Sequence, residues 1–246
     1  DEVLNEHSAS VRVNGEWQTF SNARAAEEAA FGEYKENLRR NAENFHIIDD
    51  HLGEGGPKAK FQANIEAIKL LKYLEETTGQ ATPEQQETLS RYVGWGGIPQ
   101  AFDAQNEDWR REYAELKALL SETEYVSARA STLNAHYTSP TVIRAIYNAV
   151  EQMGFRTGNI LEPAMGVGPF FGLLPESMAG SRLYGVELDS ITGRIARQLY
   201  PEADITVAGF ETTDRRDFFD LAVGNVPFGN YQVNDKAYNH LRFNIH

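Results

Sequence analysis

The stretch ILEPAMGVGPF, residues 160–170, runs from apolar residues directly into a glycine-rich turn. Its first residues continue a predicted strand at residues 159–162, which the small residues Ala164, Gly166 and Gly168 follow. Small residues at the carboxyl end of a strand permit a tight turn and let a ligand approach the backbone closely. A Gly-x-Gly pair alone is often no more than a turn, so its function depends on what surrounds it.

The rest of the chain after residue 135 predicts a parallel sheet around that strand. Further predicted strands lie at residues 183–187, 205–208 and 219–223, and residues 190–199 form the clearest helix between them. Short strands separated by crossover segments are typical of a doubly wound, Rossmann-like α/β fold. A helix is also expected from Pro140, with an apolar face made of Val142, Ile146, Val150 and Met153.

The front of the chain predicts a mainly helical region. The run VRVNGEWQTF predicts a hairpin that turns at Asn14-Gly15, and residues 21–45 are expected to form a helix. In ATPEQQETLSRYV, Thr82 is a predicted N-cap and begins a capping-box pattern. We therefore expect a helical region over residues 1–135 and an α/β domain over residues 136–246. Further expected helices lie at residues 61–71 and 108–120.

The composition is that of an ordinary globular protein, with 246 residues, 41% hydrophobic and 24% charged. No apolar run is long enough to span a membrane and the acidic start lacks a signal-peptide pattern, so a cytoplasmic protein is expected. The absence of cysteine excludes disulfides, thiolate metal sites and a cysteine nucleophile, and the six histidines lack metal-ligand spacing, so no metal site is expected. The formal charge of −13, most of it in residues 1–135, is unfavourable for phosphate binding.

An acidic residue, Glu187, ends the second predicted strand in YGVELD, 21 residues after Gly166. In nucleoside-binding sheets, an acidic residue at this place accepts hydrogen bonds from the ribose hydroxyls. Together with the glycine turn, it predicts a nucleoside cofactor. The dinucleotide fingerprint is incomplete, because Phe171 stands where that pattern has its third glycine.

The residues before the glycine turn, Glu162 and Pro163, also do not belong to the dinucleotide pattern. Acid-Pro-Ala-x-Gly-x-Gly instead resembles the S-adenosylmethionine loop of methyltransferases. A positive sulfonium suits a pocket of carboxylates; the alternative for Glu162 is an ordinary loop or helix-terminus carboxylate. The resemblance implies that the cofactor-binding residues here include Glu162, Ala164, Gly166, Gly168 and Glu187.

The segment GNVPFG, residues 224–229, follows the fourth predicted strand beside the same crevice. It resembles the Asn-Pro-Pro-Phe/Tyr motif of N6-adenine DNA methyltransferases. The resemblance implies that the Asn225 side-chain oxygen and a backbone carbonyl just after it accept hydrogen bonds from the adenine amine. It also implies that Phe228 stacks on the flipped base. Val226 before Pro227 departs from the family's proline and keeps its carbonyl, but loses its rigidity; the alternative is a strand that runs into a Pro-Gly turn.

Two more segments follow the family order. HYTSP resembles the Tyr-Thr-Pro stretch that closes over the methionine part of the cofactor, with Tyr137 and Thr138 at the matching positions; the alternative is ordinary helix capping. In VAGFE, Phe210 matches an aromatic near the cofactor adenine, whereas Gly209 does not match the family's acid. Core packing is the alternative for Phe210.

More narrowly, RYVGWGGIPQAFD, HYTSP, VELDSITGRIARQLYP and GNVPFGNYQVND resemble the methylase region of very large methyltransferase–helicase proteins of phages and mobile elements. The role of Trp95 in the first segment is open between a structural turn and a base-stacking site. Only 18 residues follow Phe228, so we expect a fragment of a longer protein, with C-terminal sheet strands missing and further domains continuing the chain. The resemblance makes a helicase a candidate for one of these domains. The expected partner is DNA with a flipped adenine.

Two other functions stay open. The same motif also serves RNA and protein-glutamine N-methylation, in which another planar amine or amide is held alike. A different class is a catalytically silent methyltransferase-fold scaffold, whose acidic front half contacts a partner protein. Val226 and Gly209 are the departures that favour this scaffold.

Overall fold

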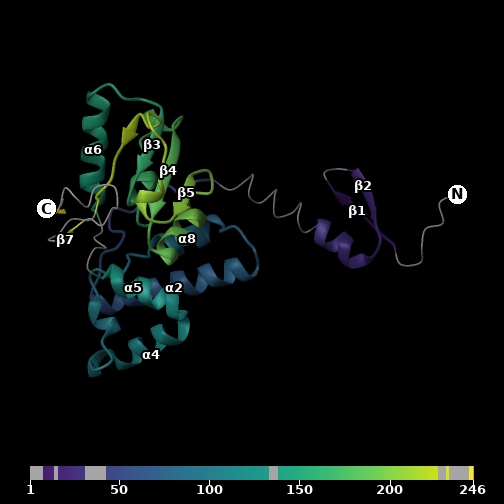
Figure 1. Cartoon of the computed structure of the whole chain (residues 1–246), viewed down its shortest axis with the longest axis horizontal. Helices are drawn as coiled ribbons and strands as arrows, with labels where there is room; N and C mark the ends of the chain where they lie inside the picture. Colours follow the sequence, from purple (N-terminus) through teal and green to yellow (C-terminus); the bar gives the residue numbers. More distant parts are fainter. Residues whose placement is uncertain are drawn as a thin grey trace.

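The computed structural model describes residues 8–13, 16–30, 43–132 and 138–226, together with the backbone of residues 231–232 and 244–245. Its centre is a four-stranded parallel sheet in the order β5-β4-β3-β6 (Figure 1). Numbered by appearance in this sheet, the order is 3-2-1-4, which is that of one end of the Rossmann fold. The predicted α/β fold is therefore confirmed. The strands are β3 (Asn159–Glu162), β4 (Arg182–Glu187), β5 (Asp204–Val207) and β6 (Leu221–Ala222).

Strand β3 pairs with a neighbour on each side. Glu162 stands opposite Gly185 of β4, and Leu161 stands opposite Ala222 of β6. Strand β6 is only two residues long, but its pairing continues because the Val223 N–H donates to the Leu161 carbonyl at 2.9 Å. Since all four strands are parallel, their carboxyl ends meet at one edge of the sheet.

Three helices accompany the strands: α6 (Pro140–Gln152), α7 (Pro169–Gly172) and α8 (Ser190–Leu199). Helix α6 begins at Pro140 as predicted, but its predicted apolar face is partly wrong. Ile143 and Tyr147 are buried, whereas Val142 and Met153 are exposed. The Tyr147 hydroxyl donates to the carbonyl of Phe170 in α7 at 2.8 Å, so the side of α6 that carries Tyr147 faces inward.

The helical part that precedes the sheet is formed by α2 (Pro57–Glu76), α3 (Pro83–Ser90), α4 (Arg110–Leu119) and α5 (Glu122–Ser131). The predicted capping box at Thr82 is confirmed. Helix α5 was not predicted, although Ser121 and Glu124 form the same kind of capping box before it. Short 3₁₀ turns lie at Pro99–Phe102, Glu107–Trp109, Glu176–Met178 and Phe210–Thr212.

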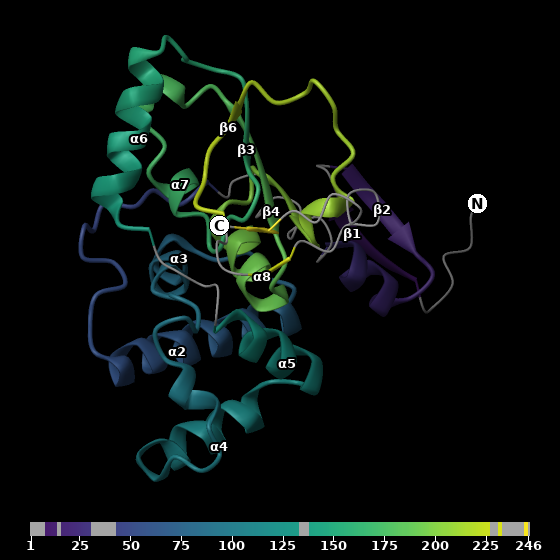
Figure 2. The ribbon, with the colours of Figure 1, turned by 60° about the vertical axis from the view of Figure 1, so that its left-hand side comes forward.

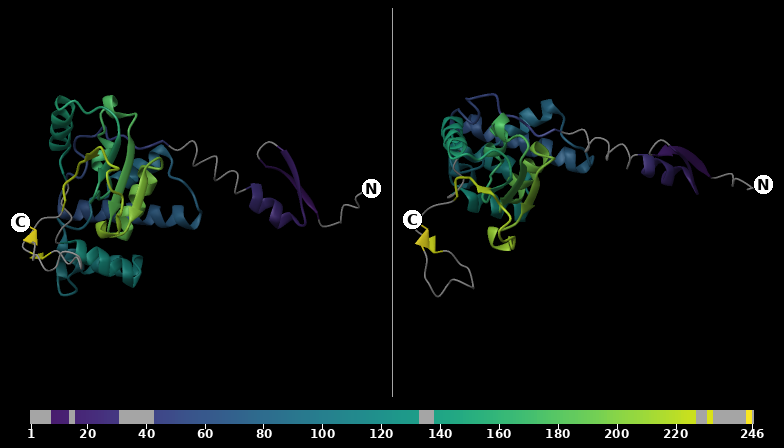
Figure 3. Two further views of the ribbon diagram at one scale, coloured as in Figure 1. Left: turned by 45° about the horizontal axis from the view of Figure 1, so that its top comes forward. Right: turned by 90° about the horizontal axis from the view of Figure 1, so that it is seen from above.

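An antiparallel hairpin, β1 (Ala9–Val13) and β2 (Glu16–Phe20), lies near the N-terminus. The predicted hairpin is confirmed, while its turn at Asn14-Gly15 lies outside the described residues. Figure 1 and both views of Figure 3 place this hairpin apart from the main body. A second small antiparallel pair, β7 (Tyr231–Gln232) and β8 (Asn244–Ile245), lies near the C-terminus.

The predicted helix over residues 21–45 is wrong at its end. Residues 23–30 are helical, whereas residues 43–49 are not. The Phe45 N–H donates to the Leu199 carbonyl at 2.8 Å, and the Ile47 N–H donates to the Gly172 carbonyl at 2.7 Å. These long-range backbone bonds replace the helical ones, so tertiary contacts outweigh local helix propensity here.

The helical part and the sheet share one continuous core, whose buried residues run from Ile47 to Val223. Helix α8 contacts β4 and β5 and also α2, α3 and α5, so it lies between the two parts (Figure 2). The division of the chain near residue 135 stays a prediction, because residues 133–137 lie outside the described part.

Trp95 belongs to this core. Its side chain is fully buried, and its ring meets Phe102 edge-on with centroids 5.2 Å apart. A buried ring cannot stack on a nucleic-acid base, so the base-stacking hypothesis for Trp95 is wrong and the structural one is confirmed.

Arg194 of α8 ties the sheet to the helical part through two carboxylates. Its guanidinium donates two hydrogen bonds of 2.7 Å to Glu75 and one of 2.8 Å to Glu124. Lys72 donates to the other Glu124 oxygen at 2.9 Å. Burial alone would raise the pKa of Glu124, but the hydrogen bonds from Lys72 and Arg194 outweigh it and lower that pKa to about 2.

We expect Arg194→Gln to lower the free energy of unfolding by about 2 kcal/mol at neutral pH, because hydrogen bonds to charged groups are lost. The pKa of Glu124 is lower in the folded state than its ordinary value of 4.5. The stability that ionised Glu124 contributes is therefore fully present above pH 4.5 and is lost as the pH falls toward 2. The free energy of unfolding that Arg194→Gln loses relative to the unmodified protein, measured by urea unfolding, should therefore be smaller at pH 3 than at pH 7. Arg91→Gln, at an exposed position, is the control; an equal loss at both pH values would contradict the expectation.

Candidate functional site

The carboxyl edge of the sheet brings together several of the predicted site residues. Glu162 ends β3 and Glu187 ends β4. Asn225 follows β6, the other neighbour of β3. A Cβ atom at Gly224 would lie 3.5 Å from both the Glu162 Cγ and the Pro163 Cδ, so the chain leaving β6 passes against the chain leaving β3.

The glycine turn after β3 is held by backbone hydrogen bonds. The Met165 N–H donates to the Val186 carbonyl at 3.0 Å, and the Gly168 N–H donates to the Met165 carbonyl at 2.8 Å. Gly168 has φ +79°, and a Cβ there would lie 2.5 Å from the Tyr200 ring, so both conformation and space require glycine. Gly166 has φ +58°, and a Cβ there would have no atom within 4 Å among the described residues, so this turn presents bare backbone beside open space.

The Glu187 carboxylate accepts two backbone N–H groups. Gly166 donates to Oε2 and Asp189 donates to Oε1, each at 2.8 Å. Burial raises the pKa of Glu187, the nearby charge of Asp189 adds to the rise, and the two N–H donors oppose it. The carboxylate is thus fixed in direction at the edge of the site.

Glu162 is 2% exposed, and no group among the described residues donates to its Oε2. Burial, and then the charge of Glu187, raise the pKa of Glu162 well above its ordinary value. An unpaired buried carboxyl oxygen is costly unless a partner arrives or the group holds a proton. The site can therefore accept a cation or a hydrogen-bond donor at this oxygen.

Asn225 is exposed, and its amide nitrogen donates to the Thr138 Oγ1 at 3.2 Å. Val226 beside it is 53% exposed. Tyr137, Pro227 and Phe228 lie outside the described residues, so their predicted roles stay predictions. The contact with Thr138 joins the segment before α6 to the segment after β6, two of the motifs that the sequence placed in one crevice.

Phe210 lies in the 3₁₀ turn after β5 and is 52% exposed, so its interpretation as a core residue is wrong. The Ala208 N–H donates to the Glu187 carbonyl at 2.9 Å, which keeps the exit of β5 beside that of β4. The predicted role of Phe210 near the cofactor adenine stays a prediction. Ala164 follows Glu162 in the turn and is half-buried.

One residue beside the site was missed by the sequence prediction. Asp189 is buried and caps helix α8, accepting the Thr192 N–H at 2.9 Å. Its other oxygen accepts from Ser127 of α5 at 2.7 Å. Asp189, directly before the helix in LDSIT, is an N-cap signal that could have found the capping role, whereas nothing local could have found Ser127.

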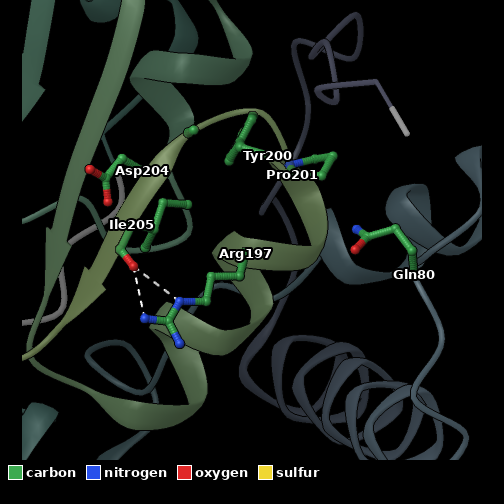
Figure 4. A pocket seen from close by; sticks show the side chains of 7 residues that line it. Gln80, Arg197, Tyr200, Pro201, Asp204 and Ile205 are labelled. Carbon is green, nitrogen blue, oxygen red and sulfur yellow. Dashed lines mark hydrogen bonds between the residues drawn. The ribbon is translucent and has the colours of Figure 1, made fainter. Parts of the chain in front are cut away.

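The described residues also form two cavities away from this edge. One, of about 360 Å³, lies at the opposite end of β5, beside Asp204 (Figure 4). There the Arg197 guanidinium donates to the Ile205 carbonyl through Nε at 3.0 Å and Nη2 at 2.8 Å. The other, of about 480 Å³, runs along α5 beside Tyr125 and Val126. Neither cavity is lined by a predicted site residue.

Within the described ranges, no three His, Asp or Glu side chains are gathered in a way that could hold a metal ion. In the same ranges, no helix combines the length and the apolar character needed to cross a membrane.

We expect Glu162→Gln to stabilise the protein increasingly as the pH rises from 5 to 8. Because the folded state raises the pKa of Glu162, the folded protein keeps a proton that the unfolded chain has lost above pH 4.5, and stability falls as the pH rises through this window. Each tenfold difference in the acid constant corresponds to about 1.4 kcal/mol. Melting temperatures at pH 5 and pH 8 measure the effect, with the exposed Glu176→Gln as the control; a gain that does not grow with pH would contradict it.

No family model matches this chain. It is 28% identical over 192 residues to "Defense against restriction protein B" of Escherichia phage P1, an alignment that covers 76% of this chain and 7% of that protein. It is 37% identical over 93 residues to "Type II methyltransferase M.CvrRI" of Paramecium bursaria Chlorella virus XZ-6E, covering 37% of this chain and 24% of that protein. It is also 34% identical over 104 residues to "Type II methyltransferase M.TthHB8I" of Thermus thermophilus, covering 42% of this chain and 23% of that protein.

Among solved structures, a protein of Listeria monocytogenes described as a class I S-adenosylmethionine-dependent methyltransferase aligns over 71% of this chain and 61% of its own, with 12% identity and a TM-score of 0.31. The assignment of the fold rests on the strand order and not on this alignment. The chain spans no more than about a quarter of the curated relatives that it matches. The sequence comparisons confirm the predicted resemblance: this chain is homologous to type II methyltransferases and to a much longer phage protein.

Proposed function

We propose that this chain carries the cofactor-binding and catalytic residues of an S-adenosylmethionine-dependent N6-adenine DNA methyltransferase. The observation that carries the proposal is the meeting of Glu162, Glu187 and Asn225 at one edge of the sheet. Methyltransferase relatives support methyl transfer in general. The choice of cofactor and of acceptor rests on the chemistry of these three side chains and on the resemblance of their motifs.

A cationic cofactor fits the acids of this edge. The buried Glu162 has an oxygen with no donor among the described residues, and the turn at Gly166 leaves open space beside its backbone. A cation with N–H groups, such as the methionine ammonium of S-adenosylmethionine, would give that oxygen a partner and favour its charged form. When bound, S-adenosylmethionine supplies an electrophilic methyl group on a sulfonium.

Glu187 is suited to bind the ribose of the cofactor. An ionised carboxylate has about four lone-pair positions, and the two N–H groups from Gly166 and Asp189 occupy two of them. The remaining positions can accept the two ribose hydroxyls, as in other nucleoside-binding sheets. Half-exposed Phe210, after the next strand along, is the proposed contact of the adenine ring.

Asn225 is proposed to orient the acceptor amine. Because its amide nitrogen donates to Thr138, its amide oxygen is the end left to accept an N–H bond. The backbone carbonyl of Val226 would accept the second N–H bond of an exocyclic amine. Two acceptors would draw the amine nitrogen toward tetrahedral geometry and aim its lone pair at the methyl group. Methyl transfer is then a direct displacement, and the amine proton leaves to water or to an accepting side chain.

The proposed acceptor is an adenine flipped out of DNA, with Phe228 stacking on it. The acidic chain offers little to phosphates, so DNA-binding surfaces are expected in further domains of a longer protein. The resemblance to methyltransferase–helicase proteins adds a helicase as one such proposed domain.

We expect Glu187→Ala to weaken binding of S-adenosylmethionine by about tenfold to a hundredfold, since hydrogen bonds to a charged group are worth about 1.5–3 kcal/mol. Calorimetric titration of the 246-residue chain measures this. Glu176→Ala, an exposed glutamate remote from the site, should bind as the unmodified chain does. Equal affinity of the unmodified chain and Glu187→Ala would refute the ribose role.

We expect Asn225→Ala to reduce methyl transfer to DNA by about a hundredfold to a thousandfold in the longer protein that the sequence predicts, while cofactor affinity stays within about twofold. The assay follows the methyl group from labelled cofactor and identifies the methylated base by mass spectrometry. Asn148→Ala, on the exposed side of α6, is the control. N6-methyladenine as product supports the proposal, whereas N4-methylcytosine, methylated RNA or methylated glutamine would reassign the acceptor. Unchanged DNA methylation by Asn225→Ala would refute the mechanism.

A further inference from the structure

We infer that Ser127, in helix α5 of the helical part, positions the Glu187 carboxylate for ribose binding by holding Asp189. The inference rests on the proposed function, because it concerns the same nucleoside site. It gives the helical part a role in ligand selection.

The Asp189 carboxylate is held from two sides. The Ser127 Oγ donates to Asp189 Oδ2 at 2.7 Å, while Thr192 donates to Oδ1 through its N–H at 2.9 Å and its hydroxyl at 2.7 Å. The side chain is 6% exposed, so water can replace these donors only if the turn opens. One side of the carboxylate is thus fixed by its own helix and the other by α5.

The backbone of the same residue fixes Glu187. The Asp189 N–H donates to Glu187 Oε1 at 2.8 Å, opposite the bond from Gly166 to Oε2. Two donors on different oxygens leave the carboxylate little freedom to rotate about its last bond. Moving Asp189 would move one of them, and with it the direction in which Glu187 presents its remaining lone pairs.

The two neighbouring carboxylates, Asp189 and Glu187, repel each other, so a donor that holds Asp189 in place matters for both. The Asp189 carboxylate lies close enough to Glu187 to raise its pKa, after burial, which is the larger cause. A hydroxyl donating to a buried carboxylate disperses its charge and keeps it in place. Without the Ser127 hydroxyl, Asp189 Oδ2 would lose its donor and would turn toward water or other donors.

Helix α5 is itself fixed to α8 close to Ser127. Glu124, one turn earlier in α5, accepts from Arg194 of α8 at 2.8 Å. The position of Ser127 therefore follows from the packing of α5 on α8, and not from any mobile segment.

The test compares adenosine with 2′,3′-dideoxyadenosine, which lacks both ribose hydroxyls, by ligand-observed NMR titration of the 246-residue chain. The unmodified chain should bind adenosine about tenfold or more tightly than the dideoxynucleoside, because hydrogen bonds to a charged group contribute about that much to affinity. Ser127→Ala should reduce this preference by about threefold or more and leave the affinity for the dideoxynucleoside unchanged. A general loss of structure would instead weaken both nucleosides alike.

Two variants serve as matched comparisons. Ser131→Ala removes a hydroxyl from the same helix that donates only to the Ala128 carbonyl among the described residues, and it should keep the full preference. Ser127→Thr retains the hydroxyl and should restore most of it. An unchanged preference in Ser127→Ala, or equal weakening of both nucleosides, overturns the inference while the proposed function stands. An unmodified chain that does not prefer adenosine refutes the ribose site, and the inference with it.

A second measurement needs no ligand. The amide protons of Gly166 and Asp189, both donated to Glu187, should exchange with solvent about threefold or more faster in Ser127→Ala than in Ser131→Ala. Unchanged exchange at both amides would show that Ser127 does not hold the carboxylate, which also overturns the inference. This measurement shows whether Ser127 holds the Glu187 carboxylate through Asp189 even where nucleoside binding fails.

Discussion

Two backbone N–H groups, from Gly166 and Asp189, converge on the Glu187 carboxylate at 2.8 Å each. This contact joins the turn after β3, the end of β4 and the cap of α8. These segments can meet only when β3 and β4 pair in parallel with the observed register, which places Glu162 opposite Gly185. The geometry of the site is therefore a consequence of strand pairing, and the glycine turn is held by the acid that ends the neighbouring strand.

The same edge gathers three carboxyl groups in a chain whose formal charge is already −13. They belong to Glu162, Glu187 and Asp189, and burial raises the pKa of the first two. Hydrogen bonds from backbone, Thr192 and Ser127 stabilise Glu187 and Asp189, whereas Glu162 Oε2 receives none from the described residues. The arrangement favours a ligand that brings positive charge and hydroxyl donors together, as a sulfonium nucleoside does.

Patterns confined to a few residues were predicted well. The capping box before α3, the start of α6 and the strands β3, β4 and β5 follow from local spacing and capping chemistry. Predictions failed where distant contacts decide. Residues 43–49 are not helical, and the backbone N–H groups of Phe45 and Ile47 donate instead to the carbonyls of Leu199 and Gly172. The inward side of α6 carries Tyr147, whose hydroxyl donates to Phe170 of α7. Helix α5 was overlooked although Ser121 and Glu124 carry its capping box.

The sequence by itself determined the α/β class, the glycine turn, the acid that ends the second strand and the order of the motifs, because these depend on local conformation and on residue type. Only the tertiary structure decided which groups meet. Thr138 reaches Asn225 across 87 positions of the chain, and Ser127 reaches Asp189 across 62. Trp95 became a core residue for the same reason. Such pairs depend on how α5, α8 and the strand exits pack together, and a linear pattern carries no information on that packing.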